Sequence, residues 1–219
     1  MFLISVISSN DVSAYDVIQN LFPDKNKDFV FNITENDIVL VKEVKNNIDV
    51  RDLEKLARSI SDTLSSEFFT KVNVGIGTPV VGVKDLARSF KEAQTALEVG
   101  KVFDTDKNIV SYDNLGIARL IYHLPTTLCE TFLKEVFKKN SIESLDHETL
   151  FTIQKFFENS LNVSETSRQL FIHRNTLVYR LDKLQKSTGL DLRVFEDAIT
   201  FKIALMVVKY MKYMETYEY

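Results

Sequence analysis

The stretch SRQLFIHRNTLVYRLDKLQK, from Ser167 to Lys186, threads polar side chains through a regular series of leucines. Leu177, Leu181 and Leu184 follow one another at spacings of four and three, the period of an α-helix that buries one face. Winding the segment at about 100° per residue places its polar side chains away from that face. These are Asn175, Tyr179, Lys183 and Lys186, with Thr176 beside them and Arg174 and Arg180 at the margins. The stretch predicts an amphipathic helix whose polar face is available for binding.

A shorter helix is expected immediately before this one. In the segment NVSETSRQL, Asn162 or Ser164 is suited to cap the first turn, because either side chain can accept a hydrogen bond from a backbone N–H group. Glu165, three residues after Asn162, completes a pattern that resembles a capping box. Residues 170–173 would form the turn, and the second helix would begin near Arg174. Two helices joined by so short a turn predict a helix-turn-helix, whose second helix enters the major groove of DNA.

Packing of such a helix pair needs a small residue on the first helix and apolar residues around the turn. Ser167, Leu170 and Ile172 stand at these positions, together with the leucines of the second helix. Phe171 departs from the usual pattern, because many such turns carry glycine at this point, where the φ angle is often positive. The sequence therefore predicts the pair of helices and leaves the conformation of the turn open.

Charge is distributed unevenly along the chain. The whole protein carries a formal charge of −4 and has a pI near 5.5, which argues against a protein that coats nucleic acid with an overall basic surface. Between Arg168 and Lys186, however, five basic residues stand against one acid, Asp182, so this stretch carries +4. A basic face is also typical of any solvated helix. Its combination with the helix pair is what favours DNA binding.

The side chains on the polar face suggest separate tasks. Arginine and asparagine form bidentate hydrogen bonds with guanine and adenine, whereas tyrosine, threonine and lysine more often hold phosphates. We therefore expect Arg174 and Asn175 to read bases. Phosphate contacts are expected from Thr176, Tyr179, Arg180 and Lys183, and His173 is expected to cap the helix or contact a phosphate.

The first half of the chain alternates strand-like and helical patterns. Phe2 to Ile7 reads as a strand, and the runs DFVFNI and DIVLVKEV, around Thr34 to Asn36, read as an antiparallel hairpin. Helical periodicity follows Ser13 and recurs in VRDLEKLARSISDTLSSEF and VKDLARSFKEAQTALEVGKVF, and further strands are expected in VNVGIGTPVV and NIVSYD. The order β-α-β-β-α-β-α-β, to about Asp113, predicts an α/β or α+β sandwich with helices on a mixed sheet.

From Asn114 onward the strand pattern disappears and amphipathic helices follow one another, ending in a long helix within DLRVFEDAITFKIALMVVKYMKYM. We predict an α/β domain over residues 1–113, a helical connector over 114–145 and a helix-turn-helix domain over 146–219. The fold class is α+β, a mixed sheet with helices followed by an all-α domain.

Other kinds of site find little support. Gly75 and Gly77 lack the third glycine of a dinucleotide-binding loop and the Lys-Ser/Thr pair of a phosphate loop, so we interpret them as a bend at a strand edge. The three histidines lie in separate elements, and Cys129, the sole cysteine, fits a reducing cytoplasm. No run approaches the ~20 apolar residues of a membrane helix. We expect no metal, no cofactor, no catalytic residue and no membrane association.

The segment LNVSETSRQLFIHRNTLVYRLDKLQKSTGLDL resembles the C-terminal helix-turn-helix domain of the PucR/CdaR-type bacterial transcription regulators. The resemblance rests on the runs His173–Leu177, Tyr179–Leu181 and Thr188–Leu190, and it continues into AITFKIALMVV. Ser167 stands where the family usually has alanine. This resemblance implies that the domain binds DNA.

The N-terminal part resembles, more weakly, the degenerate GGDEF-like domain that precedes this helix-turn-helix in CdaR-type proteins. The similarity lies in VNVGIGTPVVGVKDLARSFKEAQTALEVGK, a Gly-Ile-Gly strand followed by an alanine-rich helix. Active cyclases of that fold need a glycine turn for the nucleotide phosphates and carboxylates for Mg²⁺, and the hairpin ITENDIVL contains no glycine. The resemblance implies a protein without cyclase activity. Many family members carry an upstream sensory domain, which we expect to be absent because nothing precedes Met1.

Together these patterns predict a cytoplasmic transcription regulator that binds double-stranded DNA, as a homodimer because two-fold operators are read by dimers. The effector, if any, is left open. The alternative is a signalling or adaptor protein whose GGDEF-like domain binds a nucleotide or a protein and whose helix pair is a protein contact. DNA binding that weakens as the salt concentration rises would favour the transcription regulator over the adaptor protein. A nucleotide cyclase is a third and less favoured hypothesis.

Overall fold

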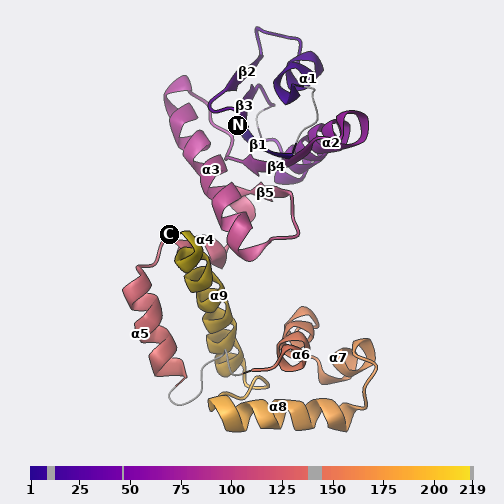
Figure 1. Cartoon of the computed structure of the whole chain (residues 1–219), viewed down its shortest axis with the longest axis vertical. Coiled ribbons are helices and arrows are strands. Elements are labelled where there is room, and N and C mark those ends of the chain that lie inside the picture. Colours follow the sequence, from indigo (N-terminus) through magenta and orange to yellow (C-terminus); the bar gives the residue numbers. More distant parts are fainter. Residues whose placement is uncertain (9–12, 46, 138–144, 218–219) are drawn as a thin grey trace. The chain divides into compact units, whose positions relative to one another are not determined.

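The computed structural model describes residues 1–8, 13–45, 47–137 and 145–217 (Figure 1). The chain divides into two compact units, residues 1–122 and 123–219. Of the expected connector, helix α4 (Ile117–Tyr122) belongs to the first unit and α5 (Thr126–Val136) to the second, and residues 138–144 lie outside the described part. The division at residues 113 and 146 stays a prediction.

Strands and helices of the first unit follow the predicted order. Their bounds are β1 (Phe2–Ser8), α1 (Ala14–Leu21), β2 (Asp28–Asn32), β3 (Asp37–Lys42), α2 (Val50–Phe68), β4 (Lys71–Ile76), α3 (Leu86–Phe103) and β5 (Ile109–Ser111), with 3₁₀ turns η1 (Val83–Asp85) and η2 (Tyr112–Asn114). The described strands form one mixed sheet in the order β2-β3-β1-β4-β5, in which only β4 and β5 run parallel. The predicted α+β class and the β2–β3 hairpin are confirmed, although β4 ends earlier than the run VNVGIGTPVV suggested.

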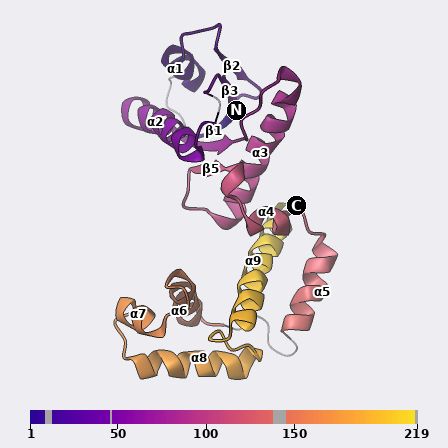
Figure 2. The same ribbon diagram turned by 180° about the vertical axis from the view of Figure 1, so that it is seen from behind.

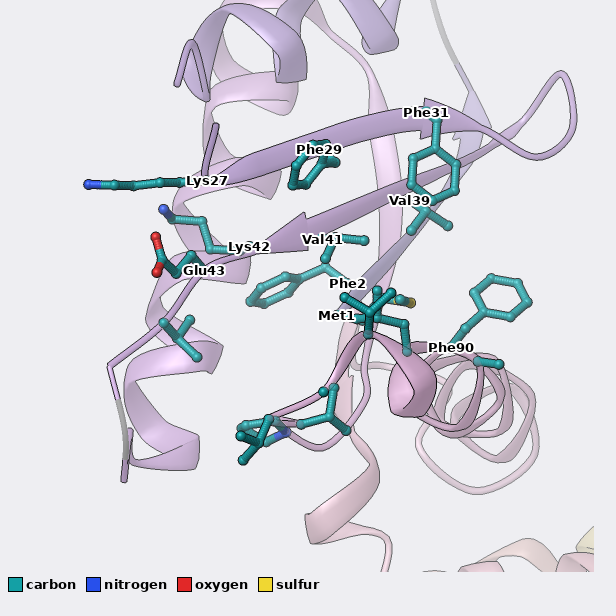
Figure 3. Close-up of a pocket in the computed structure, with 18 of the residues that line it drawn as sticks. Met1, Phe2, Lys27, Phe29, Phe31, Val39, Val41, Lys42, Glu43 and Phe90 are labelled. Atoms are coloured by element: carbon teal, nitrogen blue, oxygen red, sulfur yellow. The ribbon is translucent and has the colours of Figure 1, made fainter. Parts of the chain in front are cut away.

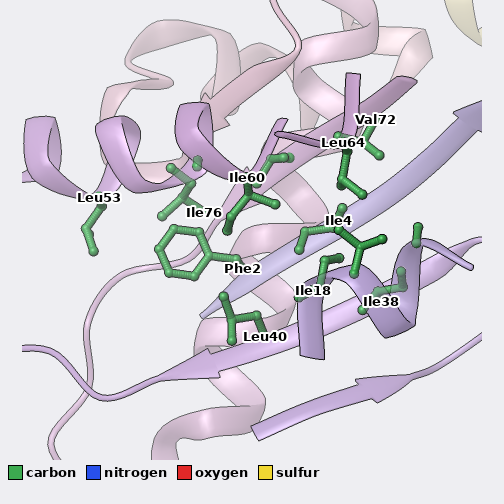
Figure 4. Close-up of a cluster of buried hydrophobic side chains, with 14 residues drawn as sticks. Phe2, Ile4, Ile18, Ile38, Leu40, Leu53, Ile60, Leu64, Val72 and Ile76 are labelled. Carbon is green, nitrogen blue, oxygen red and sulfur yellow. The ribbon is translucent and has the colours of Figure 1, made fainter. Parts of the chain in front are cut away.

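Helices cover both faces of this sheet, α1 and α2 on one and α3 on the other (Figure 2). Successive strand residues point to opposite faces, so Phe2 and Ile4 pack with Ile18 of α1 and Ile60 of α2 (Figure 4). Leu3, which lies between them, instead packs with Val39, Ala93 and Leu97 on the α3 face. The larger core therefore lies under α1 and α2.

Strand β4 explains how closely α3 approaches the sheet. Gly75 lies inside the strand and pairs with Leu3, so its interpretation as a bend at a strand edge is wrong. A Cβ atom at Gly75 would lie 2.2 Å from the carbonyl oxygen of Ala93, and one at Gly77 would lie 1.9 Å from that of Ser89. The two glycines leave room for the backbone of α3.

Helices build the second unit, as predicted. After α5 come α6 (His147–Glu158), α7 (Val163–Gln169), α8 (Arg174–Thr188) and α9 (Phe195–Tyr217). Their buried core combines Ile153 and Phe156 of α6, Leu177, Leu181 and Leu184 of α8, Leu192, and Phe201 of α9. The ring of Phe137 meets that of Phe201 edge-on, with centroids 5.8 Å apart. The leucine face of α8 is thus packed against α6 and α9, which leaves its polar face outward.

Candidate nucleic-acid interface

Side chains cap both helices of the predicted helix-turn-helix. The Asn162 side chain, one of the two N-caps that the sequence allowed, accepts a hydrogen bond from the backbone N–H of Glu165 at 3.0 Å. The Nδ1 atom of His173 accepts one from the N–H of Asn175 at 3.2 Å, which confirms the capping role expected for this histidine. Four residues, 170–173, separate α7 from α8. The local sequence therefore sets where each helix begins.

The turn between the helices contains a left-handed residue, Phe171, whose φ angle is +54°. Its N–H donates to the carbonyl of Arg168 at 3.1 Å, and the N–H of Ile172 donates to that of Ser167 at 3.0 Å. The Phe171 side chain is 96% exposed, so it contributes almost no burial in return for this conformation. The turn has the conformation that glycine adopts readily, and here phenylalanine adopts it.

Replacing Phe171 by glycine is expected to raise the free energy of unfolding by about 0.5–1 kcal/mol. A left-handed conformation costs a non-glycine residue roughly 1–2 kcal/mol, which exceeds the ~0.5–1 kcal/mol that glycine loses through the flexibility of the unfolded chain. Urea unfolding followed by circular dichroism measures the change. The alanine variant is the control, because it keeps the backbone penalty. Equal stability of the two variants would show that the turn does not hold a positive φ.

The predicted contact residues come together along one side of α7–α8. The side chains of His173, Arg174, Asn175, Thr176, Tyr179 and Lys183 are all exposed. Tyr179, the largest of them, is 69% exposed, whereas each leucine on the opposite side of α8 is at most 2% exposed. The face predicted to bind DNA is open, and its amphipathic partner face is buried.

Arg180 differs from the other predicted contact residues. Its guanidinium donates to the Thr152 hydroxyl at 3.0 Å and forms an ion pair with Glu148, both on α6. The side chain is 27% exposed, and these bonds tie the middle of α8 to α6. In this structure Arg180 orients the helix that carries the exposed residues.

Acidic groups border the same face. Asp182, the one acid between Arg168 and Lys186, forms an ion pair with Arg193 at 2.8 Å, so its negative charge is compensated locally. Asp146 caps α6 and lines, with Lys183, a groove of about 380 Å³ between α6 and α8. Hydrogen bonds from Thr149 and, more weakly, the charge of Lys183 hold the pKa of Asp146 below its usual value. The face is therefore positive along α8 and negative where α6 begins.

Comparison with known families supports both parts of the chain. The model of the PucR C-terminal helix-turn-helix domain matches residues 149–207, and that of a GGDEF-like domain matches residues 1–99. The chain belongs to the PucR/CdaR family. The family resemblance inferred from the motifs is thereby confirmed, and the first match covers α7, α8 and most of α9.

Named relatives of this PucR/CdaR-family chain are bacterial regulators. The carbohydrate diacid regulator of Escherichia coli K12 is 27% identical over 190 residues, 84% of this chain and 49% of that protein. The purine catabolism regulatory protein of Bacillus subtilis 168 is 27% identical over 143 residues, 65% of this chain and 27% of that protein. The proline-responsive transcriptional activator PutR of the same organism is 25% identical over 188 residues, 82% and 45% of the two chains. The chain spans half or less of the length of each.

The β2–β3 turn, where a cyclase of the GGDEF fold would need glycine, is held by side-chain hydrogen bonds in this PucR/CdaR-family chain. At the β2–β3 turn the hydroxyl of Thr34 donates to the carboxylate of Asp37 at 3.0 Å and accepts from the N–H groups of Asn36 and Asp37. Asp37 is the first residue of β3, directly after the turn. Within the described residues, no group of three His, Cys, Asp or Glu side chains could hold a metal ion, and no described helix is long and apolar enough to span a membrane.

Sequence reasoning missed the groups that fix α8 from outside. Glu148 and Thr152 lie about 30 residues before Arg180, and no spacing rule connects them. Arg193 was likewise not identified, although it bonds Asp182 and Asp191 at the end of α8 and holds the pKa of Asp191 below its usual value. Only the presence of a complementary charge elsewhere in the chain, an acid for Arg180 and a base for Asp182, could have suggested either contact.

Proposed function

We propose that this PucR/CdaR-family chain is a transcription regulator that binds double-stranded DNA by placing α8 in the major groove. The observation that carries the proposal is the capped helix pair whose polar face is exposed while its leucines are buried. The positive charge of this stretch, within an otherwise acidic chain, supports the same partner. The regulators among its relatives support the assignment to transcription.

In this proposal Arg174 and Asn175, in the first turn of α8, read base edges, because both side chains can form bidentate contacts. Thr176, Tyr179 and Lys183 hold phosphates, and His173 caps the helix beside them. For Arg180 we propose a positioning role in place of the phosphate contact expected from sequence, because α6 already binds its guanidinium. Helix α8 is thus bound to α6 on one side, and on the other side it exposes the side chains proposed to contact DNA.

The proposed assembly is a homodimer, since a two-fold operator requires two recognition helices. The GGDEF-like domain would serve dimerisation or regulation and would have no enzymatic activity, in keeping with a β2–β3 turn that lacks glycine. The proposed division is 1–113, 114–145 and 146–219. With DNA as partner, the proposed location is the bacterial cytoplasm.

Binding of genomic fragments by the purified chain tests this function. The fragments that the protein retains at moderate salt would be sequenced and their affinity measured as salt is raised. We expect the logarithm of the affinity to fall linearly with the logarithm of salt concentration, because neutralised phosphates release counterions. A chain that retains no DNA at low salt would contradict the proposal and favour an adaptor whose helix pair contacts protein.

Lys183→Ala is expected to weaken binding to all fragments alike and to reduce the salt slope by about 0.9, the contribution of one phosphate contact. Anisotropy titrations on specific and scrambled DNA measure both effects. The matched control is Lys134→Ala on α5, an exposed lysine paired with Glu130, which should leave binding unchanged. A loss confined to the specific fragment would instead assign Lys183 to base reading.

A further inference from the structure

One face of the GGDEF-like unit leaves large apolar side chains uncovered. Phe29 and Phe31 of β2 are 52% and 44% exposed, and they stand opposite Val41 and Val39 of β3. Helix α3 covers Val39 but not the two phenylalanines, which border an open groove of about 810 Å³ with Phe90 across it (Figure 3). A contiguous apolar patch of this kind marks an interaction site more often than an ordinary surface.

The same phenylalanines lie on an edge strand of the sheet, because β2 ends the strand order. The N–H of Glu43 donates to the carbonyl of Lys27 and that of Ile33 donates to Asp37, so the odd-numbered residues of β2 bond β3. The backbone groups of the even-numbered residues, 28, 30 and 32, therefore point away from β3. Edge strands are commonly protected by proline or by inward-pointing charges. DFVFN contains no proline, and its buried charge, Asp28, is paired with Lys42 on the face opposite the phenylalanines.

The backbone of this edge is complementary to itself. If two copies of β2 pair antiparallel about Val30, the two Val30 residues exchange hydrogen bonds and each Asp28 faces an Asn32, so no like charges meet. Phe29 then faces the partner's Phe31 in a pair whose backbones are not hydrogen-bonded, the arrangement that brings cross-strand side chains closest. The four phenylalanines form one aromatic row on the open face.

Three local contacts bear on this pairing. Asp28 already bonds Lys42 at 2.8 Å, so its charge is balanced within its own subunit. The Tyr15 hydroxyl donates to the Val30 carbonyl at 3.4 Å, and a carbonyl oxygen has a second lone pair for the partner's N–H group. The outward N–H of Asp28 already donates to the carbonyl of Asp24 at 2.9 Å, so each Asp28–Asn32 pair would be joined only by the bond from the Asn32 N–H to the Asp28 carbonyl.

We propose that the β2 edge is the surface through which a second copy of this chain binds, by antiparallel β2–β2 pairing that joins two sheets across a two-fold axis. The choice of a second copy takes the homodimer of the proposed function as its starting point. It is supported by the register about Val30, in which no like charges meet and the exposed phenylalanines of the two copies form one row.

Sedimentation of the full chain without DNA tests the surface. We expect a concentration-dependent dimer for the wild type, and at least a tenfold higher dissociation constant for Val30→Pro and for Phe31→Lys. Proline at position 30 removes an N–H that faces away from β3, so the subunit keeps its own ladder, which circular dichroism would verify. The control is Leu120→Lys, an equally drastic change at a 64% exposed leucine of α4, which should dimerise normally.

Disulfide trapping tests the register. The double variant Phe29→Cys with Phe31→Cys should cross-link between subunits on mild oxidation, because position 29 of one subunit faces position 31 of the other. Phe29→Cys alone should not cross-link, because the two copies of position 29 are offset by two residues along the paired strands and lie too far apart for a disulfide. Cys129 is buried and should not react. A chain that stays monomeric, or a dimer that survives Phe31→Lys and does not cross-link, would overturn the proposal. Because DNA is absent, either result is independent of whether α8 binds DNA.

Discussion

Replacing Arg174 and Asn175 together by alanine is expected to lower affinity for the DNA fragment that the wild type binds best by about 30-fold to 10⁴-fold. Each bidentate base contact is worth about 1–3 kcal/mol of discrimination, and two are removed. Both side chains are exposed in the first turn of α8, where a recognition helix contacts base edges. Alanine favours helix, so α8 should remain folded. Fluorescence anisotropy at fixed salt measures the loss.

A DNA fragment of scrambled sequence and a second variant serve as controls for loss of base reading. Affinity for scrambled DNA should fall much less, since Lys183 and the other proposed phosphate contacts remain. Arg58→Ala, which removes one positive charge from the exposed side of α2, should change neither affinity nor sequence preference. If the double variant keeps both its affinity and its preference, Arg174 and Asn175 do not read bases.

The features of this interface that could be predicted are those set by residues close in sequence. The spacing of Leu177, Leu181 and Leu184 predicted one buried face, since burial of a helix imposes its period on the apolar residues. The caps at Asn162 and His173 are likewise local, because a capping side chain bonds a backbone group two or three residues ahead. Local rules therefore located both helices and their exposed side.

Contacts between distant residues could not be predicted in the same way. The charge of Arg180 suggested a phosphate contact, but which of several acids an arginine meets depends on how α6 packs on α8. The interpretation of Gly75 as a bend failed for a similar reason. The residue that leaves no room for a side chain there, Ala93, lies on another element and is not visible in the local sequence. Exposure of Phe29 and Phe31 also depends on how far α3 extends over the sheet, which strand periodicity does not specify.

Gly77→Ala is expected to destabilise the GGDEF-like unit by about 3 kcal/mol or more, the upper end of overpacking costs. A Cβ atom at this position would lie 1.9 Å from the carbonyl oxygen and 2.8 Å from the carbonyl carbon of Ser89, so the backbone of α3 would have to move. That helix cannot move easily, because the Ser89 hydroxyl donates to the carbonyl of Thr78 at 2.7 Å and the Thr78 N–H donates to Glu92 at 3.0 Å. The new methyl group and these bonds cannot coexist without distortion.

Hydrogen exchange locates this effect as well as measuring it. Amides of α3 should exchange much faster in Gly77→Ala than in the wild type, while those of α8, which belongs to the other unit, should be unaffected. Gly82→Ala is the matched control, because its Cβ would meet only the Asp85 carboxylate at 3.5 Å, an ordinary contact, and its change should stay within about 0.5 kcal/mol. Equal protection of α3 in the two variants would mean that the packing of α3 on β4 does not require glycine at position 77.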